Sequence, residues 1–134
     1  MALKSNREKV DMLINCFWQN GYLTISRRFG TYLPSPQPVG TYDVDAIGRY
    51  KRKFAFGIIL DSDDISNEST ANKLNFLATR QTRFSNTRVT LFVGVDSENA
   101  KKARELVASL EVEAKRNIKL VVIGERDFPK IIPN

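Results

Sequence analysis

Two aspartates, Asp45 and Asp61, belong to the first and the second half of a segment whose pattern predicts a β-hairpin. Residues 42–48 alternate between apolar and polar side chains, and residues 54–60 are continuously apolar. These patterns predict two strands, joined by the polar connection at 48–53. With a suitable register the two carboxylates converge, and a close pair either binds a divalent cation or raises one another's pKa.

A purely structural interpretation of the same aspartates has equal weight. Asp61, Asp63 and Asp64 precede a predicted helix, where acidic residues commonly cap the N-terminus and complement the helix dipole. Asp43 and Asp45 fit equally well on the solvated face of a half-exposed strand.

Basic residues outnumber acidic ones, and the net charge of +6 favours polyanionic partners, with nucleic acid first. The basic residues that flank the predicted hairpin or follow the next helix are the candidates for contacts with the backbone of a nucleic acid. They are Arg27, Arg28, Arg49, Lys51, Arg52, Lys53, Arg80 and Arg83. A soluble hairpin tip is the simpler explanation for the turn residues.

Composition excludes several other kinds of chemistry. The chain has no histidine, which excludes the usual hydrolase triads and His-ligated zinc, so any metal would be a Mg²⁺-like ion bound by oxygen. A single cysteine, Cys16, and the lack of a signal-peptide core predict a cytoplasmic protein. No apolar run is long enough to span a membrane. The length of 134 residues predicts one domain, residues 1–134.

The remaining elements follow from periodicity. Residues 5–20 predict a helix that begins with a Ser5–Glu8 capping box and ends at Gly21. Its apolar stripe is predicted to face the core: Val10, Leu13, Ile14, Phe17 and Trp18. Strands are expected at 22–26, 88–95 and 118–124, and helices from 66 or 67 to about 83 and from 96 or 97 to about 117. Residues 27–40, with three prolines, predict a long loop, and a polar tail follows the last strand.

The order α-β-β-β-α-β-α-β predicts an α/β protein. Buried strands joined by crossover helices pair in parallel, whereas the hairpin is antiparallel. We therefore expect a three-layer α/β/α sandwich around a mixed four- to five-stranded sheet.

This order, with Asp45 in the second strand and an acidic end to the third, resembles the PD-(D/E)XK nuclease superfamily, which includes restriction endonucleases and Holliday-junction resolvases. The resemblance spans residues 5–124 and implies a restriction-endonuclease-like core, Mg²⁺-dependent DNA cleavage and, as in many core-only members, a homodimer. Asp45 matches the family's first aspartate, with Asp43 as the alternative, and Glu8 or Asp11 could match its helix acid.

The family's second motif, acid-spacer-lysine, does not match. If Asp61 is the acid, Asp63 stands at the lysine position; in a shorter register the motif falls on residues 58–60 and is absent. Hydrolysis needs a cation beside the metal ligands, and Lys73 or Arg80 on the next helix could supply it.

The sequence thus favours a nuclease-related DNA-binding domain with an incomplete active site. If the protein is an enzyme, Asp45 and Asp61 hold Mg²⁺ and Lys73 assists as the third catalytic residue. The alternative is a catalytically inactive interaction or sensor module that retains the fold. A nucleotide-binding domain ranks last because the chain contains no glycine-rich phosphate loop.

Overall fold

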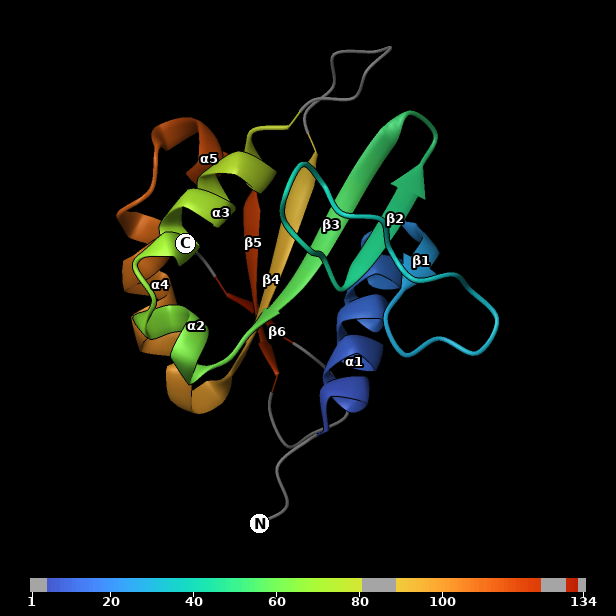
Figure 1. Ribbon diagram of the computed structural model, residues 1–134, viewed down its shortest axis with the longest axis horizontal. Coiled ribbons are helices and arrows are strands. Elements are labelled where there is room, and N and C mark those ends of the chain that lie inside the picture. The colour runs from blue at the N-terminus through green and yellow to red at the C-terminus, as the bar shows by residue number, and fades with distance from the viewer. Residues whose placement is uncertain (1–4, 81–88, 124–129, 133–134) are drawn as a thin grey trace.

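The computed structural model describes residues 5–80, 89–123 and 130–132, and it forms an α/β sandwich with three layers (Figure 1). The elements in chain order are α1 (Asn6–Gln19), β1 (Leu23–Arg27), β2 (Ala46–Tyr50), β3 (Lys53–Leu60), α2 (Ser62–Ser66), α3 (Ser69–Ala78), β4 (Thr90–Asp96), the 3₁₀ turn η1 (Ser97–Asn99), α4 (Ala100–Ala108), α5 (Val112–Arg116), β5 (Ile118–Ile123) and β6 (Lys130–Ile132).

One mixed sheet with the order β1-β2-β3-β4-β5-β6 forms the middle layer. β1, β2 and β3 are antiparallel neighbours, whereas β3, β4 and β5 run parallel. The carboxyl ends of these three parallel strands therefore share one edge of the molecule, called here the carboxyl end, and their starts share the opposite edge, the amino end. The predicted fold class is confirmed, and β6 adds a short edge strand where a polar tail was expected.

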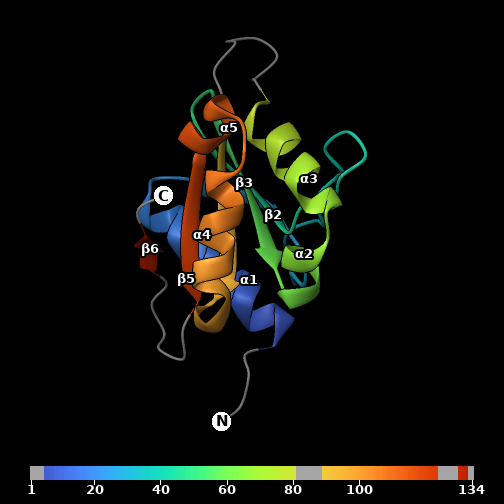
Figure 2. The same ribbon diagram turned by 90° about the vertical axis from the view of Figure 1, so that its left-hand side faces the viewer.

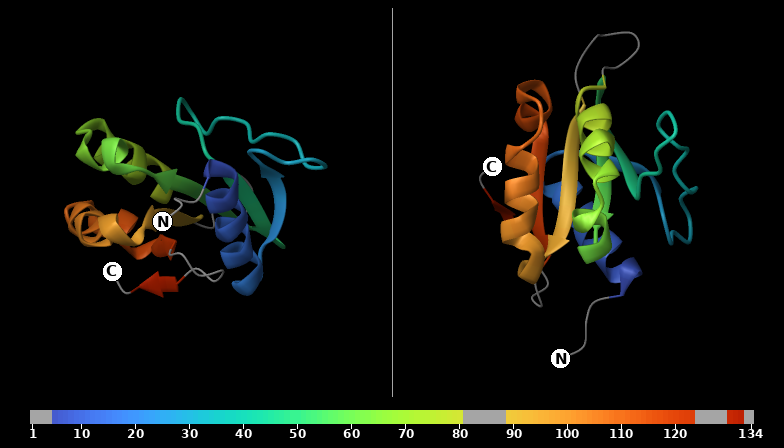
Figure 3. Two further views of the ribbon diagram at one scale, coloured as in Figure 1. Left: turned by 90° about the horizontal axis from the view of Figure 1, so that it is seen from below. Right: turned by 60° about the vertical axis from the view of Figure 1, so that its left-hand side comes forward.

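The helices are divided unequally between the two faces (Figures 2 and 3). α1 alone packs on one face, where Leu13 and Phe17 are fully buried against β3 and β4. α2 to α5 cover the other face, over a larger core that includes Leu74 and Leu91. This division places the start of α1 and the start of α2 on opposite sides of the carboxyl end of β3.

Two glycines allow α1 to lie close to the sheet. A Cβ atom on Gly57 would lie 2.6 Å from Leu13 Cδ2, and one on Gly48 would lie 2.9 Å from Phe17 Cδ2. Because both distances are shorter than real Cβ contacts, these strand positions accept no side chain without moving the helix. The close packing fixes the first turns of α1, including Lys9, beside the end of β3.

Several predicted boundaries are wrong. The helix expected from residue 66 or 67 to about 83 is α3, which begins later, at Ser69, and ends earlier, at Ala78; the short helix α2, which Asp61 caps and Asn67 ends, precedes it and was not predicted. The helix expected at 96–117 is divided into η1, α4 and α5, and the chain turns after Ser109 so that Leu110 and Ala114 reach the core. Trp18, predicted to be core, has 69% of its surface exposed.

Candidate functional site

A polar pocket of about 130 Å³ lies at the carboxyl end, between the first half of α1 and the end of β3. Its lining residues are Asn6, Lys9, Val10, Arg28, Phe29, Asp45, Ile59, Asp61 and Asp64. In open α/β sheets, ligands bind preferentially beyond the carboxyl ends of the strands. The pocket brings Asp45 and Asp61 together, as the sequence predicts, and adds two cations, Lys9 and Arg28.

Asp45 is buried, and both of its carboxylate oxygens accept hydrogen bonds. Arg28 Nη1 donates to Oδ1 at 2.8 Å, and the backbone N–H of Ile59 donates to Oδ2 at 2.7 Å. The Asp45 N–H donates in turn to the Gly57 carbonyl, so the residue extends the pairing of β2 with β3. Asp45 thus ties three segments together: the loop after β1, the start of β2 and the end of β3.

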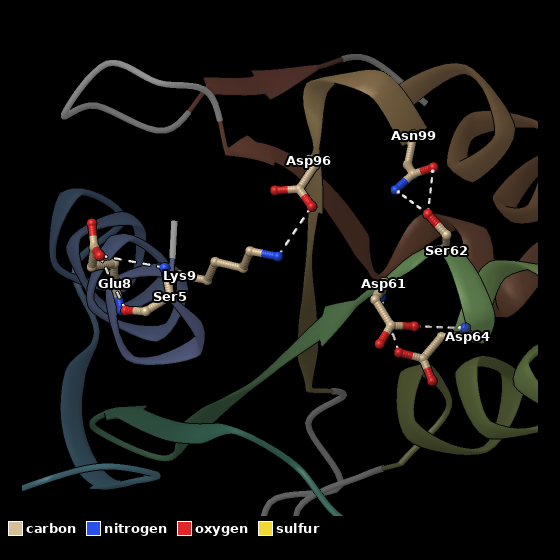
Figure 4. Close-up of polar contacts among 8 residues, drawn as sticks. All are labelled: Ser5, Glu8, Lys9, Asp61, Ser62, Asp64, Asp96 and Asn99. Carbon is tan, nitrogen blue, oxygen red and sulfur yellow. Dashed lines mark hydrogen bonds and ion pairs between the residues drawn. The ribbon is translucent and has the colours of Figure 1, made fainter. Parts of the chain in front are cut away.

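Lys9 connects α1 to the end of β4. Its Nζ lies 3.1 Å from Asp96 Oδ2, and only 12% of its side chain is exposed (Figure 4). On the other side of the same edge, Asn99 of η1 and Ser62 of α2 exchange hydrogen bonds, so α2 is tied to the segment that follows β4. Polar contacts therefore connect all three layers at this end.

Asp61 and Asp64 form a reciprocal capping box at the start of α2 (Figure 4). Asp64 N–H donates to Asp61 Oδ1 at 2.8 Å, and Asp61 N–H donates to Asp64 Oδ2 at 3.0 Å. The first of these bonds is the main cause that lowers the pKa of Asp61. Burial raises the pKa of Asp64, and the neighbouring charge of Asp61 adds to that rise. Asp61 and Asp64 therefore cap the start of a helix, as the structural interpretation of these acids predicts.

The register of β3 decides which of its residues face the pocket. Asp45 binds the Ile59 N–H, and Ile59 and Asp61 both line the pocket, as expected for alternate positions of an extended chain. Ile59, which is apolar, and Asp61, which is acidic, are therefore the residues of this segment that line the pocket, and no lysine stands two positions after either of them.

Lys73, the predicted relocated cation, lies on α3 and does not line the pocket. Its charge lowers the pKa of Asp64, against the larger opposing effect of burial. Arg80, the other candidate, follows α3 at the amino end, where its guanidinium stacks 4.5 Å from the centre of the Phe76 ring.

The donor set of the pocket does not fit a Mg²⁺ ion as it stands. Magnesium requires six oxygen ligands in near-ideal octahedral geometry. Asp45 has both oxygens engaged, and Asp61 uses one oxygen as a helix cap. Within residues 5–80 and 89–123, no group of three or more acidic or cysteine side chains is arranged to hold a metal ion.

The predicted nucleic-acid contacts divide between the two ends of the sheet. Arg27 and Arg28 lie at the carboxyl end, in ion pairs with Asp11 and Asp45. Lys51 and Arg52 form the two-residue turn between β2 and β3, and Lys53 begins β3, so these lie at the amino end. The register places Arg27 opposite Ala46 and Ala46 opposite Gly57, so about four residues of strand, at about 3.3 Å each, separate Arg27 from Lys53 by roughly 13 Å along the sheet. Arg83 lies outside the described residues.

Arg80, which the sequence suggested, and two basic residues that it did not suggest also lie at the amino end. The Arg80 carbonyl accepts from the N–H of Val89, next to the start of β4, and Arg116 and Lys119 lie at the start of β5. The amino-end basic cluster comprises Arg49, Lys51, Arg52, Lys53, Arg80, Arg116 and Lys119. Arg116 and Lys119 are exposed, and the parallel sheet places them at the same end as the hairpin turn, with β4 between β5 and β3.

Fold and site together define the class as a three-layer α/β domain with a charged pocket at the carboxyl end and a basic amino end. No family model, curated protein or solved structure matches the chain. None of the described helices is both long and apolar enough to cross a membrane.

Proposed function

We propose that this protein is a nuclease-related domain that binds the sugar-phosphate backbone of DNA through its amino-end basic cluster. The observation that carries the proposal is the separation of charge along the sheet. The turn residues Lys51 and Arg52 and the strand residue Lys53 are all exposed, and acidic residues near them are few. Such an arrangement attracts phosphates without reading sequence.

Side-chain contacts support this role for the cluster. Arg49 stacks 5.6 Å from the centre of the Phe54 ring and donates from Nε to the Lys51 carbonyl at 2.7 Å. Lys51 Nζ lies 5.4 Å from the centre of the Tyr50 ring. Stacking on rings limits the freedom of these side chains, and within the described part of the chain neither Arg49 nor Lys51 is paired with an acid, which favours binding to an anion.

Salt-dependent binding tests the proposal. The triple variant Lys51→Ala, Arg52→Ala, Lys53→Ala is expected to bind a short DNA duplex more weakly and to lower the slope of log affinity against log salt by about 3, because each lost phosphate contact removes about one unit. Fluorescence anisotropy at several salt concentrations measures both quantities.

A matched control removes the same charge elsewhere. Lys101, Lys102 and Arg104 are exposed on α4, away from the cluster. Their triple alanine variant should retain most of the affinity and most of the slope. Equal losses in the two variants would show that net charge alone attracts DNA and would contradict a located site.

Mg²⁺-dependent DNA cleavage is a second candidate, favoured by the convergence of Asp45 and Asp61 on one pocket. A metal there would have to displace Arg28 or the Ile59 N–H from Asp45. Incubation of plasmid and branched DNA with Mg²⁺ or Mn²⁺, beside Asp45→Asn, tests it. Cleavage that the substitution abolishes would establish the activity; intact DNA with both proteins would leave a binding domain.

We also propose a cytoplasmic location. Cys16, the one cysteine of the chain, is buried on α1 as a free thiol. Burial raises its pKa to about 11, so it remains a neutral core residue at physiological pH. A chain that uses cysteine in this way suits a reducing compartment.

A further inference from the structure

Aromatic side chains alternate with basic ones where the β2–β3 hairpin turns (Figure 1). The hairpin tip, residues 49–54, has the sequence Arg-Tyr-Lys-Arg-Lys-Phe, in which four of the six residues are basic. Tyr50 and Lys53 pair with one another across the hairpin. β4 begins at Thr90, opposite Ala55, so the tip extends past the parallel part of the described sheet.

Each face of the hairpin tip has its own aromatic ring, because successive residues of a strand point to opposite faces. Gly48 lies against Phe17 of α1, so Tyr50, two residues further along β2, is on the face that α1 covers. Tyr50 is nevertheless 48% exposed. Arg49 and Phe54 pair on the other face, where the half-buried ring of Phe54 lies beneath the Arg49 guanidinium. The Tyr50 ring is thus the one that is open to a ligand.

The charges beside the rings of the hairpin tip differ from those beside the exposed rings at the carboxyl end. Phe29 is exposed there, and the guanidinium of Arg28 lies 4.8 Å from its ring centre, but that guanidinium also forms an ion pair within the chain. At the tip, Lys51 Nζ lies 5.4 Å from the centre of the Tyr50 ring, and neither Lys51 nor Arg49 is paired with an acid among the described residues. An exposed ring beside a cation of this kind can bind a base and a phosphate together.

We propose that the hairpin tip binds single-stranded DNA, with an unpaired base stacked on the Tyr50 ring and the neighbouring phosphates bound by Lys51 and Lys53. The inference rests on the proposed DNA binding by the amino-end basic cluster and names the form of DNA that the tip recognises. Bases in a duplex are paired and stacked on one another, so an exposed side chain cannot reach their faces. Every unpaired base offers such a face, so this stacking requires no particular sequence.

Fluorescence anisotropy of the full chain with three labelled probes tests the proposal. The probes are an oligothymidylate strand, an abasic deoxyribose-phosphate strand of the same length and a duplex of the same length. The unaltered protein should bind the oligothymidylate at least about fivefold more tightly than the abasic strand, because only the former has bases to stack. Both strands should show the same dependence on salt, because they carry the same number of phosphates.

Substitutions of Tyr50 locate the stacking. Tyr50→Leu removes the ring and keeps an apolar side chain, so it should weaken binding of the oligothymidylate about fivefold and leave binding of the abasic strand and the duplex unchanged. Tyr50→Phe keeps the ring and should bind all three probes as the unaltered protein does. Tyr32→Leu is the matched control, because it removes a ring that is 96% exposed from the loop after β1, and it should also change nothing.

Equal affinity of the unaltered protein for the oligothymidylate and the abasic strand would overturn the inference, and this comparison requires no variant. An equal loss in Tyr50→Leu and Tyr32→Leu would also overturn it. In both cases, binding that still weakens with salt would leave the proposed function of the amino-end basic cluster in place. Absence of binding to all three probes would instead overturn the proposed function, together with the inference that rests on it.

Discussion

The two ends of the sheet hold their charges in opposite ways. At the carboxyl end, basic side chains are paired with acids: Lys9 with Asp96, Arg27 with Asp11 and Arg28 with Asp45. At the amino end, Arg49, Lys51 and Arg80 stack on aromatic rings, and none of these three is paired with an acid among the described residues. Arg28 at the carboxyl end does both, because its guanidinium also lies 4.8 Å from the centre of the Phe29 ring. Charges of the first kind stabilise the fold, and charges of the second kind remain open to an external anion.

This difference separates stability from binding. Substitutions at the carboxyl end should lower the free energy of unfolding and leave affinity for DNA nearly unchanged. Substitutions in the amino-end basic cluster should weaken DNA binding and leave the free energy of unfolding nearly unchanged. Substitutions of exposed residues usually shift stability by no more than about 0.5 kcal/mol each.

The largest stability effect is expected at Asp45. Asp45→Ala removes the acceptor of the Ile59 N–H and the partner of Arg28, and a part-buried donor left without a partner costs about 2 kcal/mol. Urea denaturation measures the loss.

Asp45→Asn is the control for this position, because its amide oxygen still accepts from Ile59, and it should lose about half as much stability. A stability of Asp45→Ala equal to that of the unaltered protein would contradict a structural role and direct attention to chemistry in the pocket.

The fold was largely predictable from periodicity. The Ser5–Glu8 capping box and the positive φ of Gly21 are both present, and they define the ends of α1 as expected. The helix from residue 96 or 97 to about 117 was predicted as continuous, and no glycine or proline interrupts it. Burial decided otherwise: the chain bends after Ser109 to bury Leu110, and such tertiary demands are not visible in local propensity.

The site was only partly predictable. The predicted neighbouring strands indicated that Asp45 and Asp61 could converge in a suitable register, and both residues line one pocket. Lys9 was missed because nothing local distinguishes it from the other surface lysines of a helix. Its pairing with Asp96 spans 87 positions of sequence and depends on how closely α1 packs on the sheet.

A smaller effect is expected at Asp61. Asp61→Ala removes the cap of α2 and should cost about 1 kcal/mol, whereas Asp61→Asn should cost a few tenths because asparagine also caps helices well. Since the fold lowers the pKa of Asp61, its stabilising charge is present above the carboxyl's ordinary pKa and is lost as pH falls through the lowered value.

Thermal unfolding of the Asp61 variants near neutral pH and near pH 3 measures this dependence, and the deficit of Asp61→Ala should shrink in acid. Asp64 acts in the opposite sense: its pKa is raised, so its contribution is lost as pH rises through that value. A deficit that grows in acid would show that the charge of Asp61 does not stabilise α2.

The smallest effect concerns the turn at the amino end. Lys51 has a φ of 54°, in the left-handed region where residues other than glycine are disfavoured. Lys51→Gly should therefore stabilise the protein by about 0.5 to 1 kcal/mol while it weakens DNA binding and lowers the salt slope by about 1. Denaturation and anisotropy on the same variant measure both changes. A gain in stability with unchanged DNA affinity would remove Lys51 from the binding surface, whereas the expected opposite changes would show that this end of the sheet retains a charge at the expense of stability.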